Sequence, residues 1–148
     1  MLNTGYELLL AGITAAVSAQ IIKFIGHIIR YREVNFQVLF TTGGMPSSHS
    51  AGVCAMATSA GLIAGFDALE FAIAAGLALV VMYDAAGIRR AAGKMAVTLN
   101  KMMVDVYKHR HQEASEKLKE LLGHTPFEVF VGALWGIFTA WAIHVYIL

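Results

Sequence analysis

Four apolar segments dominate this chain and restrict it to folds that exist in a lipid bilayer. They cover roughly residues 6–22, 50–66, 69–83 and 129–148. A helix needs about 20 apolar residues to cross a bilayer, so only the last segment has full length alone. The two middle segments form either a hairpin partly shielded by protein or longer helices with polar ends. Charged residues make up only 14% of the chain and hydrophobic residues 57%, which excludes a disordered chain and argues against a soluble enzyme.

The first apolar segment is predicted to be a retained span. Residues 1–7 contain Glu7 and no Lys or Arg, whereas a signal peptide begins with a basic region. The 14 glycines lie among Ala and Ser, a composition typical of helices that pack closely in lipid. The single cysteine, Cys54, excludes an intramolecular disulfide. We therefore expect an all-α integral membrane protein with one domain over residues 1–148, a bundle of about four transmembrane helices, and small-residue surface compatible with a homodimer.

Basic residues predict the topology. All eleven Lys and Arg lie between residues 23 and 119, in the first and third loops, which four spans place on the same side. The positive-inside rule puts those loops in the cytoplasm and both termini outside. The sequence thus predicts a multi-pass protein of the cell membrane with its large loops cytoplasmic.

The third loop is predicted to contain an amphipathic cytoplasmic helix. Its apolar residues follow helical spacing, first at Met95, Leu99, Met102 and Val106 and again at Ala114, Leu118 and Leu121. The last helix begins with a capping-box pattern, in which Thr125 is the N-cap, Pro126 is the first helical residue and Glu128 stands at the third.

Polar residues gather in three clusters on the predicted cytoplasmic side. In the first, Lys23, His27 and Arg30 form one stripe at the end of the first helix. Snorkelling cations that anchor a helix are common, and taken alone this stripe favours that simpler interpretation.

The second cluster, residues 43–50, reads GGMPSSHS directly before an apolar helix. Ser47 or Ser48 can cap that helix, and the free N–H groups at its start form an anion site. His49 then stands one step inside, able to donate or accept a proton. An ordinary N-cap after a glycine turn explains one serine and the glycines but leaves the histidine unexplained, so a functional site is the better interpretation.

The third cluster combines Asp84, Arg89 and Arg90 with His124 and Glu128. Each part has a simpler interpretation, because Glu128 completes a capping box and arginines bind lipid headgroups. Those interpretations do not explain why two helix starts, two histidines and several cations meet on one face. Cations with free N–H groups indicate a phosphate, and a histidine with a carboxylate partner indicates covalent or acid–base chemistry on it.

These residues resemble the motifs of the type-2 phosphatidic acid phosphatase superfamily, which includes the vanadium haloperoxidases. Its motifs are Lys-x6-Arg-Pro, Pro-Ser-Gly-His and Ser-Arg-x5-His-x3-Asp. Lys23 and Arg30 have the first spacing, with Tyr31 in place of proline, and residues 46–49 match the second motif with Ser48 in place of glycine.

The third motif is similar in order and context. His124 and Glu128 have the His-x3-acid spacing, with Glu in place of Asp. A much longer stretch than five residues separates His124 from Arg89 or Arg90, either of which would be the motif arginine. The whole chain resembles the short divergent bacterial branch of the superfamily.

The resemblance implies a mechanism. His124 would attack phosphorus to form a phosphohistidine, Glu128 would hold its other ring nitrogen, and His49 would protonate the leaving group. The expected phosphate-binding residues are Lys23, Arg30, Ser47, Ser48, Arg89 and Arg90. No metal ion and no other cofactor is expected.

Two functions follow from these expectations. The first is a membrane lipid-phosphate phosphatase acting on a phosphatidate-like or polyprenyl (di)phosphate substrate, with the bilayer as partner and no nucleic acid. The alternative is a non-catalytic membrane protein that binds anionic headgroups in a vestigial phosphatase pocket. A vanadate-dependent peroxidase suits a soluble protein better. His144, near the far end of the last span, is interpreted as an interfacial residue.

Overall fold

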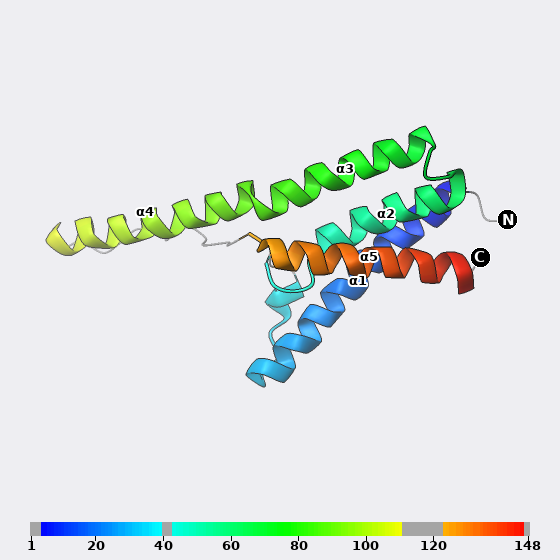
Figure 1. The fold of residues 1–148 in the computed structure, drawn as a ribbon. Helices are drawn as coiled ribbons and strands as arrows, with labels where there is room; N and C mark the ends of the chain where they lie inside the picture. Colours follow the sequence, from blue (N-terminus) through cyan, green and yellow to red (C-terminus); the bar gives the residue numbers. More distant parts are fainter. Residues whose placement is uncertain (1–3, 40–42, 111–122, 147–148) are drawn as a thin grey trace.

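The chain is helical over most of residues 4–39, 43–110 and 123–146, which a computed structural model describes (Figure 1). Side chains are described for these residues except 4, 89–90 and 105–110. The helices are α1 (Thr4–Tyr31), the short 3-10 helix η1 (Phe36–Leu39), α2 (Ser48–Ala64), α3 (Leu69–Ala86), α4 (Ile88–Arg110) and α5 (Pro126–Tyr146). The described ranges contain no strand, which confirms the all-α prediction.

The short helix α2 is the centre of the bundle. It packs against α1, α3 and α5, whereas α1 and α3 do not pack against each other within the described residues. Figure 1 shows α2 between the rod formed by α3 and α4 and the crossing pair α1 and α5. One face of α2 therefore lies between α1 and α3, which both contact α2 but not each other.

Small residues form the helix interfaces, and large apolar residues face outward. On α1, Ala11, Ala15 and Ala19 are completely buried, while Leu9 and Ile13 are more than half exposed. On α5, added Cβ atoms at Gly132 and Gly136 would collide with the backbone of α2 and of its N-cap residue. In lipid, close backbone approach through small residues drives helix association, because apolar side chains gain nothing by leaving the lipid. This arrangement fits a bundle surrounded by hydrocarbon.

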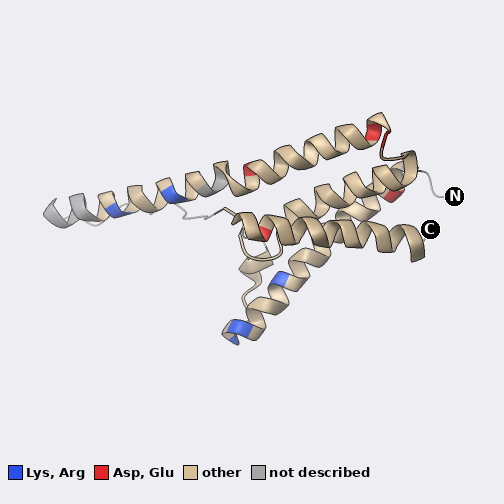
Figure 2. Cartoon of the chain, viewed as in Figure 1, with Lys and Arg blue, Asp and Glu red and all other residues tan. Residues whose placement is uncertain are grey.

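The basic residues of the bundle lie toward one of its ends. The start of α1 and the end of α5 meet at one end, where Glu7 Oε1 lies 2.7 Å from His144 Nδ1. The α2–α3 turn lies at that end too (Figure 1). Figure 2 shows basic residues on the second half of α1 and on α4, toward the opposite end. The predicted topology requires the basic residues to lie at the end away from both termini, as they do here. Which end faces the cytoplasm stays a prediction.

Three stretches are long and apolar enough to cross a membrane: Gly5–Tyr31, Leu69–Val104 and Pro126–Tyr146. Helix α2 has 17 residues, which is less than a full span, and protein shields it on three sides. The prediction of about four membrane-embedded helices is therefore confirmed, with the second short and shielded.

The predicted helices agree with the observed ones in one place and differ in another. Helix α1 extends past the apolar segment 6–22 to Tyr31, so it carries Lys23, His27 and Arg30 at its end, as predicted. The amphipathic helix of the third loop exists as α4, but it continues α3 almost directly: Gly87 donates to Tyr83 O and accepts from Ala91 N. The second part of the predicted helix, residues 111–122, lies outside the described residues.

Candidate active site

The N-termini of α2 and α5 lie against each other. Ser47, the N-cap of α2, donates its backbone N–H to Glu128 O of α5 at 3.2 Å. Gly132, one turn further along α5, faces the backbone of Ser47, and a Cβ there would collide with it. The absence of a side chain at Gly132 thus lets two helix N-termini, each with a positive dipole end, approach one point.

The predicted capping box at the start of α5 is confirmed. Glu128 N donates to Thr125 Oγ1 at 3.3 Å, and Thr125 N donates to Glu128 Oε2 at 3.0 Å. The two bonds satisfy two N–H groups that the helix start would otherwise leave unpaired. They also fix the carboxylate one turn above His124.

The same carboxylate oxygen holds His124. His124 Nδ1 lies 3.3 Å from Glu128 Oε2, and the imidazole is only 2% exposed. Among the described residues, His124 Nε2 is a buried nitrogen with no hydrogen-bond partner. When Nδ1 carries the proton and donates it to the carboxylate, Nε2 bears the free lone pair. Glu128 therefore serves the cap and the histidine with one atom.

Electrostatics favour the neutral form of His124. Burial lowers the pKa of His124 below its usual range, the Glu128 hydrogen bond opposes this effect, and the charge of Lys23 lowers the pKa further. A neutral imidazole with an unprotonated Nε2 is the form that can act as a nucleophile.

Lys23 is a buried cation beside this group. Its side chain is 7% exposed, and its stem runs along the glycine turn, where a Cβ at Gly44 would lie 3.4 Å from Lys23 Cδ. Gly43 and Gly44 adopt positive φ angles of 104° and 83°, which L side chains rarely adopt. The glycine turn thus has the shape that lets the lysine stem pass beneath it.

The start of α2 contributes Ser47, Ser48 and His49 to the candidate site. Ser47 Oγ accepts from Ser50 N at 3.4 Å and from Ser50 Oγ at 3.0 Å, so its own hydrogen remains for another acceptor. Ser48 is half-buried and His49 exposed, in the first turn of α2. The ring centroids of His49 and His124 are 6.1 Å apart, with ring planes at 65°.

Of the expected arginines, only Arg30 has a described side chain, and it lies away from this group. Arg30 is exposed in the last turn of α1, two turns beyond Lys23, and its guanidinium lies over the Tyr31 ring at 5.6 Å from the centroid. Arg89 and Arg90 are in the first turn of α4, and their side chains lie outside the described residues. Lys23, Ser47, His49, His124 and Glu128 are brought together, with Ser48 beside them.

Two polar contacts were missed by sequence reasoning. Ser50 is completely buried and donates to Ser47, and a serine three residues after an N-cap serine was the available signal. His144 pairs with Glu7 across 137 positions, which no local pattern reveals. Within the described ranges, no three His, Cys, Asp or Glu side chains gather as ligands for a metal ion.

Comparisons with known proteins agree with this architecture. Residues 5–139 match the sequence profile of the Divergent PAP2 family. The chain is also 39% identical over 139 residues to the uncharacterized membrane protein YuiD of Bacillus subtilis (strain 168), covering 87% of this chain and 88% of that protein. No solved structure matches significantly. The helical bundle, the matched motif residues and the near-complete profile match together show that the chain is a membrane protein of the Divergent PAP2 family.

Proposed function

We propose that this protein is a membrane lipid-phosphate phosphatase that works through a phosphohistidine on His124. The observation that carries the proposal is the state of this imidazole: Nδ1 faces a carboxylate, and Nε2 is buried without a partner among the described residues. A polar nitrogen buried in this way carries a free-energy cost, which is typical of functional sites.

The first step transfers the phosphoryl group. The Nε2 lone pair attacks phosphorus, a P–N bond forms and the bond from phosphorus to the ester or anhydride oxygen breaks. The leaving oxygen takes a proton from His49. Glu128 stabilises the imidazole as it becomes cationic, because its negative charge lies against Nδ1.

The second step releases phosphate. Water attacks the phosphohistidine, His49 accepts a proton from that water, and the P–N bond breaks with its electron pair returning to Nε2. His49 thereby regains the proton it gave to the leaving group, so the enzyme returns to its starting state.

Charge on the phosphoryl oxygens is stabilised by Lys23 and by the start of α2. The lysine is buried, and a buried cation interacts with an anion much more strongly than one in water. Ser47 retains a hydroxyl hydrogen for a phosphate oxygen, and the helix dipole adds positive potential.

Lipid phosphates are the proposed substrate class because the site lies at the end of helices that cross a membrane. The candidates are a phosphatidate-like monoester and a polyprenyl (di)phosphate, both with a phosphate at the membrane surface and a chain in the hydrocarbon. One observation favours the non-catalytic alternative: Arg30 lies away from His124, so Lys23 is the basic side chain that the described residues bring to the site.

Purified protein in proteoliposomes, tested for phosphate release against a panel of lipid phosphates without added metal, separates these functions. We expect turnover of at least one lipid phosphate, abolished by His124→Ala and His124→Asn, with the fold of both variants intact. Saturable binding of lipid phosphates without phosphate release would instead establish the headgroup-binding protein.

The role of His49 has its own test. Because a good leaving group needs little protonation, His49→Ala should slow alkyl phosphates far more than a nitrophenyl phosphate. Equal loss on both substrates would show that His49 is not the general acid.

A further inference from the structure

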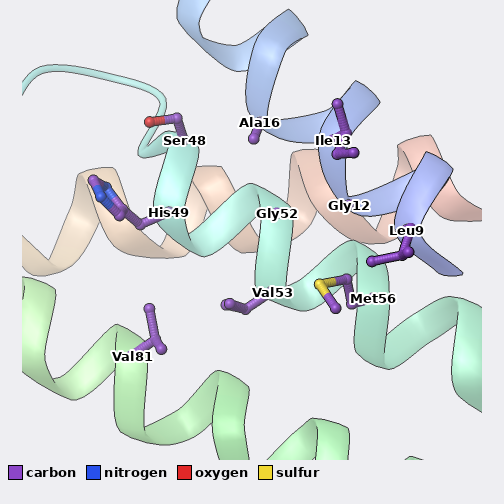
Figure 3. A pocket seen from close by; sticks show the side chains of 10 residues that line it. All are labelled: Leu9, Gly12, Ile13, Ala16, Ser48, His49, Gly52, Val53, Met56 and Val81. Carbon is purple, nitrogen blue, oxygen red and sulfur yellow. The ribbon is translucent and has the colours of Figure 1, made fainter. Parts of the chain in front are cut away.

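An apolar groove runs along α2 away from the candidate active site. It has a volume of about 480 Å³ and is bounded by α1 on one side and α3 on the other (Figure 3). Its lining residues are Leu9, Gly12, Ile13 and Ala16 of α1, Ser48, His49, Gly52, Val53 and Met56 of α2, and Val81 of α3.

The groove exists because α1 and α3 both pack on α2 but not on each other within the described residues. Helix α2 is its floor, and the gap between the two outer helices leaves it open along its length. Since these helices cross a membrane, the open side faces hydrocarbon. A lipid chain can therefore enter sideways, without leaving the bilayer.

The two ends of the groove differ in chemistry. Ser48 and His49, its polar lining residues, stand at one end, and the His49 ring lies 6.1 Å from that of His124. Met56 lies toward the other end, where its Cγ occupies the space beside Gly12 that a Cβ would need (Figure 3). The groove thus has one polar end and one apolar end, as a single-chain lipid has.

Its length fits one chain in one leaflet. Ser48 and Met56 are eight residues apart on a helix, which corresponds to about 12 Å. A leaflet is about 15 Å deep, half of the hydrocarbon core. A chain lying in the groove would be in contact with protein through most of the leaflet.

We propose that this groove binds the hydrocarbon chain of the lipid phosphate, with the headgroup at Ser48 and His49, and that Val81, Val53 and Ile13 determine which chains are accepted. The inference rests on the proposed function for the identity of the headgroup. It adds a specificity-determining surface on α1, α2 and α3, separate from the residues that contact phosphate.

Tryptophan substitutions test the groove. Val81→Trp fills it from α3, and Ile13→Trp fills it from α1 should the first variant fold poorly. Val80→Trp is the matched control, because Val80 is the adjacent residue, is 67% exposed and does not line the groove. We expect kcat/KM for hexadecyl phosphate to fall about tenfold in Val81→Trp, with butyl phosphate unaffected and Val80→Trp like the native protein.

Photolabelling gives a readout that does not need turnover. A hexadecylphosphonate carrying a diazirine on its chain cannot be hydrolysed, and a diazirine hexadecanol is the neutral comparison. We expect the phosphonate to label residues 9–16 and 48–56 at least fivefold more than the alcohol, with the labelling lost in Val81→Trp and kept in Val80→Trp.

The outcomes are distinguishable. Labelling unchanged by both Val81→Trp and Ile13→Trp overturns the groove as a chain site, even where the native protein releases phosphate. Labelling equal for the two probes overturns the placement of the headgroup at Ser48 and His49. Groove labelling by the phosphonate without turnover of any phosphate keeps the chain site and overturns the phosphatase.

Discussion

Glu128→Gln separates two roles that Glu128 combines. Its Oε2 accepts from Thr125 N at 3.0 Å as part of the cap and lies 3.3 Å from His124 Nδ1. A glutamine side-chain oxygen in the same position still accepts both hydrogen bonds. What the substitution removes is the negative charge, which matters little for the cap and greatly for an imidazole that becomes cationic during phosphoryl transfer.

The two effects have different magnitudes. A charge near a helix N-terminus contributes about 0.3–1 kcal/mol, so thermal stability should change little. In a serine-protease triad the corresponding carboxylate-to-amide change lowers kcat about 10,000-fold. The 3.3 Å separation here exceeds the 2.7–2.9 Å of a strong charge-assisted bond. We therefore expect kcat to fall about 100- to 1,000-fold, which is a barrier increase of about 3–4 kcal/mol.

The assay is phosphate release in proteoliposomes, combined with a thermal melt in detergent. Thr125→Ala is the matched control: it removes the other half of the capping box, the bond from Glu128 N at 3.3 Å, but leaves the carboxylate charge. It should cost about 1 kcal/mol of stability and leave turnover nearly intact. Glu128→Gln with turnover within about threefold of the native rate would refute the reasoning and leave Glu128 a cap only.

Three further predictions follow from the same geometry. Because burial holds the pKa of His124 below its usual value of about 6.5, the acid-side decline of kcat/KM should begin only at pH values below that, where Nε2 becomes protonated. Lys23→Ala removes a charge that lowers this pKa, so the midpoint of the acid-side decline should move to higher pH in a pH–rate profile. Gly132→Ala places a Cβ against the Ser47 backbone and should destabilise the protein by about 1–3 kcal/mol in a thermal melt, whereas Gly76→Ala enters open space and should be neutral or slightly stabilising. Glu33→Cys, made in a background lacking the native cysteine, should resist a membrane-impermeant thiol reagent applied to intact cells, because the first loop is predicted to be cytoplasmic. Labelling from outside would contradict the predicted topology.

Local patterns predicted much of the geometry of the candidate site. The capping box at the start of α5 and the N-cap at the start of α2 each lie within four consecutive residues, and both are observed. The same spacing puts Glu128 one helical turn from His124, so their contact follows from local geometry. Apolar segment length predicted the class of fold, because hydrocarbon requires backbone groups to be satisfied within each helix.

The rest depends on tertiary contacts that no local pattern contains. The helical stripe of Lys23 and Arg30 could be predicted, but not that Arg30 stands two turns beyond Lys23 with its guanidinium over the Tyr31 ring, away from His124. The burial of Lys23 and the groove over α2 arise only when helices pack. Gly132 is one of 14 glycines, and its role is visible only against Ser47 of another helix.

Trapping the covalent intermediate tests the central claim most directly. Purified protein is mixed with a lipid phosphate, quenched in alkali because a phosphorus–nitrogen bond on histidine breaks in acid, digested and examined by mass spectrometry. The proposed mechanism predicts a phosphoryl group on the peptide that contains His124, absent in His124→Asn. In His49→Ala it should accumulate when a nitrophenyl phosphate is the substrate, because that leaving group needs no proton whereas the hydrolysis step still lacks its base. Turnover that proceeds in His124→Asn, or a phosphoryl group found on another residue, would contradict it.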